Sequence, residues 1–254
     1  MYVYIYDNWL RAKKFASTVK AMEIRLTDFG IAGKIVRLQN YTDAKALIDD
    51  EVRRGAKTIV VVGNDKTFGQ ILSGAATAGC IFGFLPVGGD NTIAEVLGIP
   101  IGADACTVLS RRRIEKLDIG WVNNRYFVSQ LKAGPGQLEV FYDERFRVTG
   151  QNLLEVVVCN LQPWFWKRNS QDRNFEVVHP QDGKLEAWLR PLTRKRFWGY
   201  SYEDPSIFPF SEMEIKSQEP FTVEADGKIT KEIRIKIKLA PERVNMIVGR
   251  DRKF

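Results

Sequence analysis

The chain has 254 residues and a formal net charge of +7, from 38 Lys and Arg against 31 Asp and Glu. Hydrophobic residues make up 44% of the sequence and charged residues 27%, which excludes a largely disordered chain. The longest apolar runs, such as Thr58–Val62, fall far short of the ~20 residues that cross a bilayer, and Met1–Leu10 does not resemble a signal peptide. We therefore expect a cytoplasmic protein of one large or two modest domains.

The cysteines and the histidine are too few and too scattered for a metal cluster. Cys80, Cys106 and Cys159 stand far apart in apolar segments, which predicts buried thiols and no disulfide framework. A Ser-His-Asp hydrolase would have to use His179, which precedes Pro180 in a turn-like stretch, so we expect a surface turn residue there. The isoelectric point of 9.3 allows an anionic partner, either a nucleotide, a phospholipid surface or nucleic acid.

Strand and helix patterns alternate through the first half of the chain. The expected elements, in chain order, are a strand over 1–6, a helix over 12–29 that Gly30 ends, a strand over 34–38, a helix over 43–54 with Thr42 as N-cap, a strand over 58–62, a helix over 67–77, a strand over 81–85 and a short helix over 92–97. The run TIVVV over 58–62 is typical of a strand buried on both faces of a parallel sheet. The alternation predicts an α/β domain with an open, mostly parallel sheet.

The pattern changes after about Asp118, where apolar and polar residues alternate with a period of two. Strands are expected over 121–128, 138–141, 153–159, 184–190, 212–217, 221–224 and 229–237, with turns at Asn123-Asn124, Asp182-Gly183 and Asp226-Gly227. This predicts an antiparallel β-sandwich domain. We place the α/β domain at 1–120 and the β domain at 121–243.

Two strand-to-helix turns carry residues suited to phosphate binding. The first contains Gly63, Asn64, Asp65, Lys66 and Thr67, and the second runs from Pro86 to Thr92 with Gly88, Gly89 and Asn91. Such turns present backbone N–H groups and a helix N-terminus to an anion, and glycine allows its close approach. Turns at the carboxyl ends of parallel strands flank one crevice, so the two turns together predict a nucleotide-binding site. Each turn taken alone is equally typical of an ordinary tight connection between a strand and a helix.

Five segments follow one another in an order that matches a known kinase family. They are VVVGNDKTFGQIL, LPVGGDNTIAEVLGIP, LDIGWVNNRYF, HPQDGKLEAWL and FTVEADGKITKEI. The series resembles the diacylglycerol kinase catalytic family, which includes bacterial lipid kinases and sphingosine kinases and carries Gly-Gly-Asp-Gly-Thr at the first position. The resemblance runs from about Thr58 to Val248. The resemblance implies the two-domain fold of that family, in which residues 244–254 return to the first domain. It also implies ATP and Mg²⁺ as cofactors and a lipid hydroxyl as the phosphate acceptor.

The resemblance also implies the nucleotide-binding residues, with departures from the family pattern. They are Gly63, Asn64, Asp65, Lys66, Thr67, Gly88, Gly89 and Asn91. Asn64 and Lys66 stand where the family has glycine, and Gly89 replaces its threonine. Tyr6–Trp9 replaces an Asn-Pro-x-x-Gly loop that helps to hold nucleotide in the family. Lys66 either places its cation on a phosphate or is a solvated side chain on an altered loop.

The acidic residues of the β domain have two interpretations each. Lys228 replaces the glutamate that the family uses as the base on the lipid hydroxyl. In one interpretation Asp226 takes over the role of the base, and in the other Asp226 is an ordinary residue of a hairpin turn. Asp182 corresponds to an acid that resembles the family's Mg²⁺ ligand, with Glu186 at the place of a second acid. The Asp182-Gly183 pair is equally typical of a turn.

Two segments, over 163–168 and 190–200, combine aromatic with basic residues. Their candidate contact residues are Trp164, Trp166, Arg194, Lys195, Arg196 and Trp198. This composition suits a membrane surface with anionic lipid. It also suits single-stranded nucleic acid, the less favoured partner, or an aromatic cap on the β domain.

The sequence thus predicts a lipid-kinase-like protein that phosphorylates a diacylglycerol-type hydroxyl with ATP, if its altered motifs retain activity. The alternative is a catalytically inactive homologue that serves as a ligand-, membrane- or protein-binding module. A third interpretation is another kinase of the same superfold, such as an NAD kinase. The segment Gly83–Leu85 is compatible with such a kinase, but the motifs of the β domain argue against it. Peripheral membrane association and a homodimer are left open.

Overall fold

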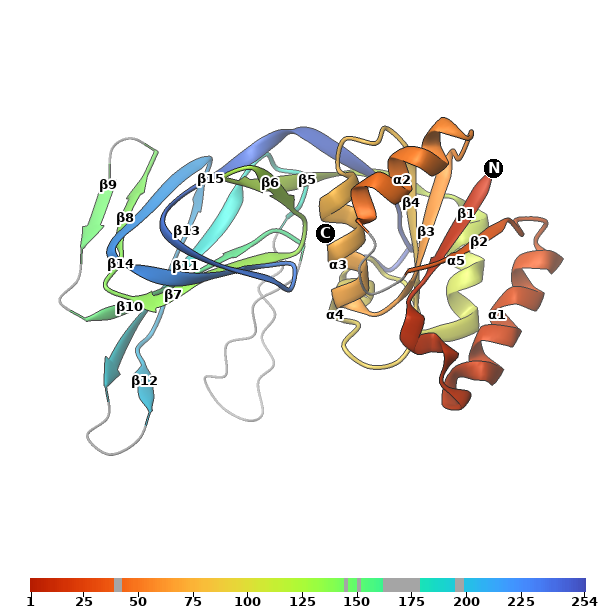
Figure 1. Cartoon of the computed structure of the whole chain (residues 1–254), viewed down its shortest axis with the longest axis horizontal. Helices are drawn as coiled ribbons and strands as arrows, with labels where there is room; N and C mark the ends of the chain where they lie inside the picture. Colours follow the sequence, from red (N-terminus) through yellow and green to blue (C-terminus); the bar gives the residue numbers. More distant parts are fainter. Residues whose placement is uncertain (39–42, 144–145, 150–151, 162–178, 195–198) are drawn as a thin grey trace. The chain divides into compact units, whose positions relative to one another are not determined.

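The computed structural model describes residues 1–38, 43–143, 146–149, 152–161, 179–194 and 199–254 (Figure 1). The chain divides into two compact units. The α/β unit comprises Met1–Leu117 together with Glu242–Phe254, and the β unit comprises Asp118–Pro241. Each unit is described below by itself.

The sheet of the α/β unit is parallel. Its strands are β1 (Tyr2–Tyr6), β2 (Lys34–Arg37), β3 (Thr58–Gly63) and β4 (Ile81–Pro86), in the order β4-β3-β1-β2. The C-terminal end of β15 (Lys228–Ile247) pairs with β4, also parallel, through Asn245 and Met246. The open, parallel α/β sheet expected from the sequence is confirmed.

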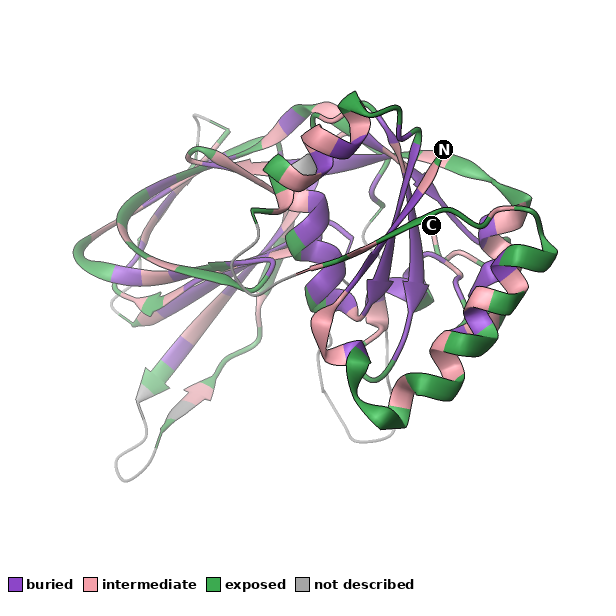
Figure 2. Cartoon of the chain, turned by 45° about the vertical axis from the view of Figure 1, so that its right-hand side comes forward, coloured by how far each residue is buried: buried purple, intermediate pink, exposed green. Residues whose placement is uncertain are grey.

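Helices cover both faces of this sheet. The helical elements are η1 (Asn8–Arg11), η2 (Lys13–Phe15), α1 (Ala16–Asp28), α2 (Ala44–Arg53), α3 (Asp65–Ala75), α4 (Thr92–Val96), η3 (Gly102–Asp104) and α5 (Ala105–Arg111). In Figure 1, α2 and α3 lie on one side of the strands, and α1 and α5 lie on the other. Strands β1, β3 and β4 are almost entirely buried (Figure 2), because the apolar runs of β3 and β4 face helices on both sides, whereas the edge strand β2 is mostly exposed.

Three helix starts differ from the sequence-based expectation. The helix expected from residue 12 begins at Ala16, after the 3₁₀ turn η2, and the helix expected from residue 67 begins at Asp65. The Asp43 carboxylate accepts a hydrogen bond from Lys45 N, so Asp43 is the N-cap of α2, and Thr42 lies outside the described residues. The difference at α3 bears on the candidate site, because it places Asp65 within the helix.

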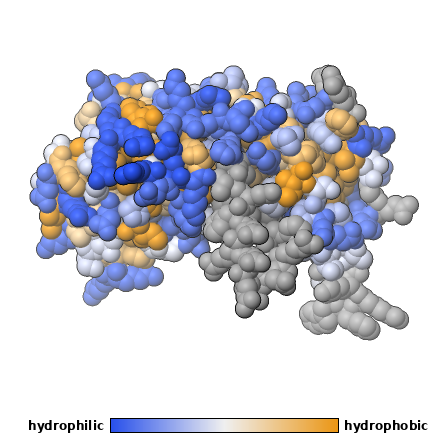
Figure 3. All heavy atoms as spheres, turned by 180° about the vertical axis from the view of Figure 1, so that it is seen from behind, coloured by the Kyte–Doolittle hydropathy of each residue, from blue (hydrophilic) through white to orange (hydrophobic). Residues whose placement is uncertain are grey.

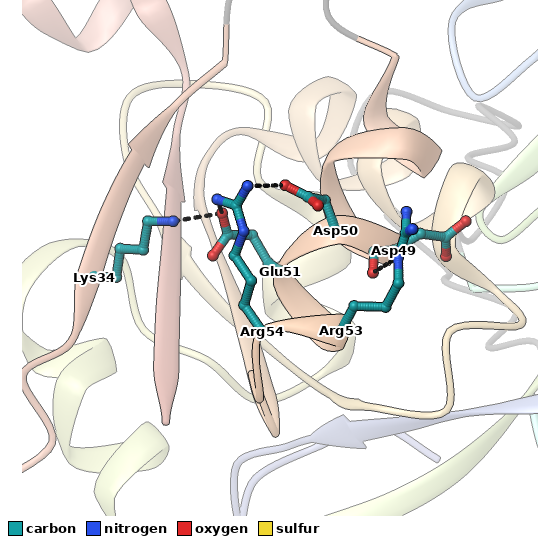
Figure 4. A network of polar contacts seen from close by, with 6 residues as sticks. All are labelled: Lys34, Asp49, Asp50, Glu51, Arg53 and Arg54. Atoms are coloured by element: carbon teal, nitrogen blue, oxygen red, sulfur yellow. Dashed lines mark hydrogen bonds and ion pairs between the residues drawn. The ribbon is translucent and has the colours of Figure 1, made fainter.

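A network of charges joins α2 to the edge strand β2 (Figure 4). Glu51 of α2 is only 2% exposed, and Lys34 Nζ of β2 lies 2.5 Å from its Oε1 atom. Arg54 reaches the same oxygen at 3.6 Å and also pairs with Asp50 at 2.7 Å. A buried carboxylate is costly unless a cation compensates it, so this pair ties the end of α2 to the sheet edge.

The β unit is antiparallel throughout. Its strands are β5 (Ile114–Val122), β6 (Arg125–Phe127), β7 (Gln130–Gly136), β8 (Glu139–Tyr142), β9 (Phe146–Thr149), β10 (Leu153–Cys159), β11 (Leu185–Arg194), β12 (Tyr200–Tyr202), β13 (Ser206–Phe210), β14 (Glu212–Ala225) and most of β15. The main order is β12-β11-β10-β7-β14-β15, with β5 and β6 beside β15. The predicted antiparallel region is confirmed. A large cluster of buried side chains, including Val156, Phe210, Ile215 and Ile235, forms most of its core. A smaller cluster is formed by Val157, Cys159 and Trp188.

The helices and the surface can be compared with what a membrane-spanning helix requires. None of the helices in the described part of the chain combines the length and the apolar composition that crossing a bilayer requires. On the face shown in Figure 3, hydrophobic residues lie among hydrophilic ones in both units. Exposed single hydrophobic residues are normal for a folded domain.

Candidate functional site

The first predicted turn is built around the N-cap of α3. Asn64 has an extended backbone, and its Oδ1 atom accepts a hydrogen bond from Thr67 N at 3.2 Å. Gly63 precedes it, and a Cβ atom at Gly63 would lie 2.8 Å from Thr67 Oγ1. Glycine is therefore needed here because the first turn of α3 folds back closely onto the end of β3.

Asp65 joins the first turn to the second. Its backbone N donates to the carbonyl of Asp90 at 3.0 Å, and its Oδ2 atom accepts from Ile93 N, in the first turn of α4, at 2.9 Å. Burial raises the pKa of the Asp65 carboxyl to about 7, although hydrogen bonds from the N-terminal amides of α4 oppose the shift. Its Oδ1 atom is buried and has no hydrogen-bond partner among the described residues.

The second predicted turn lies directly beside the first. Val87 N donates to Gly63 O at 2.8 Å, which holds the two strand ends together. Gly88 has φ +83°, a conformation that favours glycine, and Asn91 Nδ2 donates to its carbonyl at 2.8 Å. A Cβ atom at Gly89 would meet nothing within 4 Å. The two turns thus form one continuous surface at the carboxyl ends of β3 and β4.

The segment after β1 reaches both turns. Thr67 Oγ1 lies 2.5 Å from Asp7 Oδ2 and 3.0 Å from Asn64 Oδ1, and Asp7 N donates to Val62 O. The Trp9 ring covers Gly88, where a Cβ atom would lie 3.2 Å from it. Trp9 itself packs edge-on against Phe15, with the ring centroids 4.8 Å apart. From the sequence, Tyr6–Trp9 replaces a family loop and is a candidate to fill the crevice, but the individual contacts of Asp7 and Trp9 were not predicted.

These internal contacts leave few donors for an anion in the first turn. Asp65 N and Thr67 N are already bonded, to Asp90 O and Asn64 Oδ1 respectively. Among the described residues, Lys66 N is the amide of the first turn of α3 without a bonded partner, and the Lys66 side chain is exposed. A phosphate would therefore meet the N-terminus of α3 chiefly through Lys66, close to the carboxylate of Asp7.

Asp226, the candidate base, holds a turn of the β unit. Its Oδ2 atom accepts from Val128 N at 2.8 Å, and its Oδ1 atom accepts from Ser129 N at 3.0 Å and from the Ser129 hydroxyl. Burial raises the pKa of this carboxyl, and the hydrogen bonds from Ser129 and its neighbours oppose the shift. Both oxygens are thus engaged within the unit, which favours the turn interpretation of Asp226.

Asp182, the candidate metal ligand, also lies in a turn. Its Oδ1 atom accepts from Lys184 N at 3.0 Å, and the adjacent Gly183 N donates to Asp118 Oδ2 at 2.8 Å. Burial, followed by the charge of Asp182, raises the pKa of the Glu186 carboxyl to about 7. In the portion of the chain that the structure describes, no three His, Cys, Asp or Glu side chains are grouped to hold a metal ion.

The predicted aromatic-basic contact residues lie in and beside β11 and in the segments over 163–168 and 195–198. Trp164, Trp166, Lys195, Arg196 and Trp198 lie outside the described residues, and Arg194 is the last residue of β11.

Comparison with known proteins finds a distant similarity to lipid kinases. A sequence profile described as the diacylglycerol kinase catalytic domain matches residues 10–122, which include both turns. Over these residues the chain is distantly homologous to diacylglycerol kinases. A diacylglycerol kinase of Staphylococcus haemolyticus is 26% identical over 147 residues, 57% of this chain and 44% of that protein. A probable lipid kinase YegS-like protein of Pseudomonas aeruginosa is 27% identical over 96 residues, 37% of this chain and 32% of that protein.

The fold of the whole chain matches as well. A diacylglycerol kinase crystal structure from Bacillus anthracis superimposes with a TM-score of 0.75, covering 98% of this chain and 97% of that one at 18% identity. At that identity the match shows the fold alone. The sequence alignments cover less than half the length of the two curated relatives. Activity and substrate therefore do not carry over from the family match.

Proposed function

We propose that this diacylglycerol kinase homologue binds the phosphates of a nucleotide at its two turns and that its phosphoryl transfer to a lipid hydroxyl is impaired. The observation that carries the binding is the bridge made by Asp65. Through Asp90 O at 3.0 Å and Ile93 N at 2.9 Å, it fixes the two glycine turns side by side. Preorganised turns at the ends of neighbouring parallel strands are where ligands of open α/β sheets bind.

The donor set also fits a nucleotide accompanied by Mg²⁺. Asp65 Oδ1, buried and unpartnered, and the carboxylate of Asp90 would supply oxygen ligands, while Lys66 would contact a phosphate. When bound, Mg²⁺ neutralises charge that develops on the transferred phosphoryl group. The proposed role of Asp65 and Asp90 is to keep that cation beside the turns.

The impairment follows from the candidate base. Both oxygens of Asp226 already accept hydrogen bonds from Val128 and Ser129, so this carboxyl is poorly placed to remove a proton from an acceptor hydroxyl. Lys228 follows two residues later, and a lysine ammonium has no lone pair to accept a proton. We infer a slow transfer to diacylglycerol-type acceptors, if any.

Calorimetric titration with ATP, with and without Mg²⁺, tests the binding. The wild type should bind, more tightly with Mg²⁺, and Gly63→Val should lose binding because its side chain collides with Thr67. Because that variant risks misfolding, Lys66→Ala provides a second test without strain. Gly30→Asn is the matched control, since Gly30 has an open left-handed conformation that asparagine tolerates. Unchanged ATP affinity in both Gly63→Val and Lys66→Ala would refute the proposal.

Transfer of labelled phosphate from ATP to diacylglycerol in mixed micelles tests the impairment. The expected result is a low rate that rises at least about tenfold in Lys228→Glu, the range in which a positioned base contributes. Lys236→Glu introduces the same change of charge on the same strand and should leave the rate unchanged. A fast wild-type rate that Lys228→Glu does not alter would contradict the inferred impairment.

A second candidate function is a binding module that takes no nucleotide. This function is favoured by two internal contacts, of Asp7 with Thr67 and of Trp9 with Gly88. Through them, side chains of this protein cover the two turns where a nucleotide would bind. Absence of heat exchange at millimolar ATP, in the wild type and in Asp7→Asn alike, would favour this alternative.

A further inference from the structure

A cavity of about 340 Å³ lies within the β unit, between the β5–β6 turn and the hairpin of β14 and β15. On β15, three polar residues that line the cavity pair with buried residues of β14. Lys228, Thr230 and Glu232 lie opposite Ala225, Val223 and Phe221, respectively. Since residues that pair across two strands share a face, the three polar side chains lie in a row on the inner face of the hairpin.

An irregularity in this hairpin lies at the cavity. The two strands shift register where residues 217–220 of β14 stand opposite Ile233 of β15 alone. An insertion of this kind bends a strand and changes which side chains point to a given face. The next inner residue after Glu232 is therefore Ile235, three positions along β15, whereas a regular strand would place it two positions along. Both residues line the cavity, so the hollow coincides with the wider spacing.

The β5–β6 turn is attached to β15 at two places. Asn123 N donates to Lys236 O, and Asn123 Oδ1 accepts from Lys236 N, each at 3.0 Å. Farther along the hairpin, Arg125 Nη2 donates to Thr230 Oγ1 at 3.3 Å. These contacts fix the turn and orient the Arg125 guanidinium before a ligand binds, which reduces the entropy lost on binding.

The two cations of the cavity lie close together. Lys228 and Thr230 are two positions apart on one strand, so their side chains lie on the same face about 7 Å apart. Because Arg125 is bonded to Thr230, its guanidinium lies near Lys228. Glu232 lies about 7 Å beyond Thr230 in the opposite direction. The lining thus has a cationic end and an acidic end, and its net charge is positive.

The cationic end is open to a ligand. In the part of the chain that the structure describes, no ion pair joins Glu232 to Arg125 or Lys228, so a direct contact does not neutralise the cations. Beneath these groups, Val122 and Val223 are buried and form an apolar floor. Apolar surface combined with few convergent polar groups is typical of a site for a small molecule, and the volume is in the range of such sites.

The polar groups fit a phosphate better than they fit a carboxylate. Arg125 presents a fork of N–H donors from β6, and Lys228 supplies a point charge from β15. A phosphomonoester carries a charge of about −1.5 to −2 at pH 7, which two cations balance. Its tetrahedral oxygens accept from both strands, whereas the two oxygens of a carboxylate lie in one plane. Glu232 repels a second anionic group and can accept a hydrogen bond from a ligand hydroxyl.

We infer that this cavity binds the phosphate group of a phosphomonoester. The inference goes beyond the nucleotide binding proposed above, because every residue that carries it belongs to the β unit. The chemistry that the cavity recognises is the phosphate group itself, which a dissolved ester and a lipid headgroup share. The experiment therefore offers the phosphate from both sources.

Calorimetric titration of the full chain with glycerol 3-phosphate tests the inference. Glycerol 3-phosphate should bind, and glycerate, a hydroxylated three-carbon carboxylate, should bind at least about tenfold more weakly, because it has one negative charge and planar oxygens. Co-sedimentation with phosphatidylcholine vesicles, with and without phosphatidic acid, offers the same group on a membrane. Binding to phosphatidic acid vesicles without binding of the dissolved ester would support the phosphate site and identify a lipid as its source.

Variants of the two cations locate the binding. Arg125→Gln and Lys228→Gln should each weaken phosphate binding about tenfold, the effect of losing one charge-assisted hydrogen bond. Arg125→Lys keeps the charge without the fork and should lose less affinity than Arg125→Gln. Lys231→Gln is the matched control, because Lys231 belongs to the same hairpin but pairs with Thr222 on its outer face. Its phosphate affinity should change by less than about twofold.

Three results would overturn the inference. Absence of binding to both glycerol 3-phosphate and phosphatidic acid vesicles would exclude a phosphate ligand. Unchanged affinity in both Arg125→Gln and Lys228→Gln would place the ligand elsewhere. An equal loss in Lys231→Gln would mean diffuse attraction to positive charge. ATP affinity in Arg125→Gln should match the wild type, so failure of this inference and failure of nucleotide binding at the two turns are separate results.

Discussion

The Asp7 carboxylate lies 2.5 Å from the hydroxyl of Thr67, although the two residues are sixty positions apart in the chain. The contact follows from the sheet order, since β1 and β3 are parallel neighbours and Tyr6 pairs with Val62, so the residues that follow them meet. A negative charge at a helix N-terminus is favourable, and here it occupies a place that a phosphate would otherwise take. Asp7 thus both stabilises the turn and competes with an anionic ligand.

Replacing Asp7 should therefore strengthen nucleotide binding. Asp7→Asn keeps a hydrogen-bond acceptor for Thr67 and removes the charge. We expect ATP affinity to rise about tenfold at low ionic strength, and less at high salt, because the removed term is repulsion between charges. Calorimetry at two salt concentrations measures the effect. Asp28→Asn, at the exposed end of α1, should leave ATP affinity unaltered. A weaker affinity in Asp7→Asn would show that the carboxylate assists the ligand instead.

Asp65 should make the stability of the protein depend on pH. Its pKa is raised to about 7 in the folded chain, so between about pH 4 and pH 7 the folded state holds a proton that the unfolded state has released. Its contribution to the free energy of unfolding is thus present at low pH and decreases as the pH rises through this range, by about 1.4 kcal/mol per unit at most. Glu186 has the same sign.

Urea unfolding of the wild type and of Asp65→Asn, at several pH values between about 5 and 8, checks this prediction. Asparagine can still accept the hydrogen bond from Ile93 N, so the variant should fold and show a flatter profile. Glu186→Gln serves as the comparison in the β unit and should flatten the profile independently. Parallel profiles for wild type and Asp65→Asn would mean that Asp65 does not titrate in this range.

Removing Asp226 should destabilise the chain whether or not it acts as a base. Asp226→Ala leaves the amides of Val128 and Ser129 without their acceptor, and one unsatisfied buried amide costs about 1–3 kcal/mol. We expect a loss of about 3 kcal/mol in the free energy of unfolding, measured with urea. Asp182→Ala removes one hydrogen bond at an exposed turn and should lose less than about 1 kcal/mol. If Asp226→Ala had the same free energy of unfolding as the wild type, the hydrogen bonds of Asp226 would not contribute to stability.

The Lys34–Glu51 pair compensates one buried charge, because the Glu51 side chain is 3% exposed and the Lys34 side chain is 40% exposed. Lys34→Met leaves the Glu51 carboxylate with Arg54 at 3.6 Å, and we expect a loss of about 2 kcal/mol of stability. The double variant Lys34→Met with Glu51→Leu should recover most of that loss, because no buried charge then remains. Thermal unfolding of the three proteins measures this coupling, and additive losses would contradict it.

Much of the architecture was predictable because it depends on local patterns. The apolar runs over 58–62 and 81–85 located the two strands before the candidate turns, and the ordered motifs pointed to the family. By contrast, Gly134-Pro135-Gly136 is typical of a turn, yet it ends the strand β7, where Gly136 pairs with Leu154 of β10 beyond a shift in register. Polar residues at 64–66 also hid the true start of α3, which Asn64 caps through its side chain.

The site was harder to predict than the fold. Asp7 acquires its role only from the neighbouring position of β1 and β3, which no spacing in the sequence encodes. The acidic residue directly after a strand was the available signal, since the carboxyl ends of parallel strands meet at one edge. Similarly, the hydrogen bonds of Asp226 come from a segment nearly a hundred residues away. Contacts of this kind require the tertiary structure.

Amide resonances recorded during an ATP–Mg²⁺ titration test the central claim most directly. If the two turns bind the phosphates, the signals of Lys66 and Gly89 should shift together and saturate at the same ligand concentration. The amide signal of Gly30, which lies between α1 and the start of β2 and thus at the opposite edge of the sheet from the turns, should not shift. Stationary Lys66 and Gly89 signals at millimolar ATP, or shifts confined to other parts of the chain, would contradict nucleotide binding at these turns.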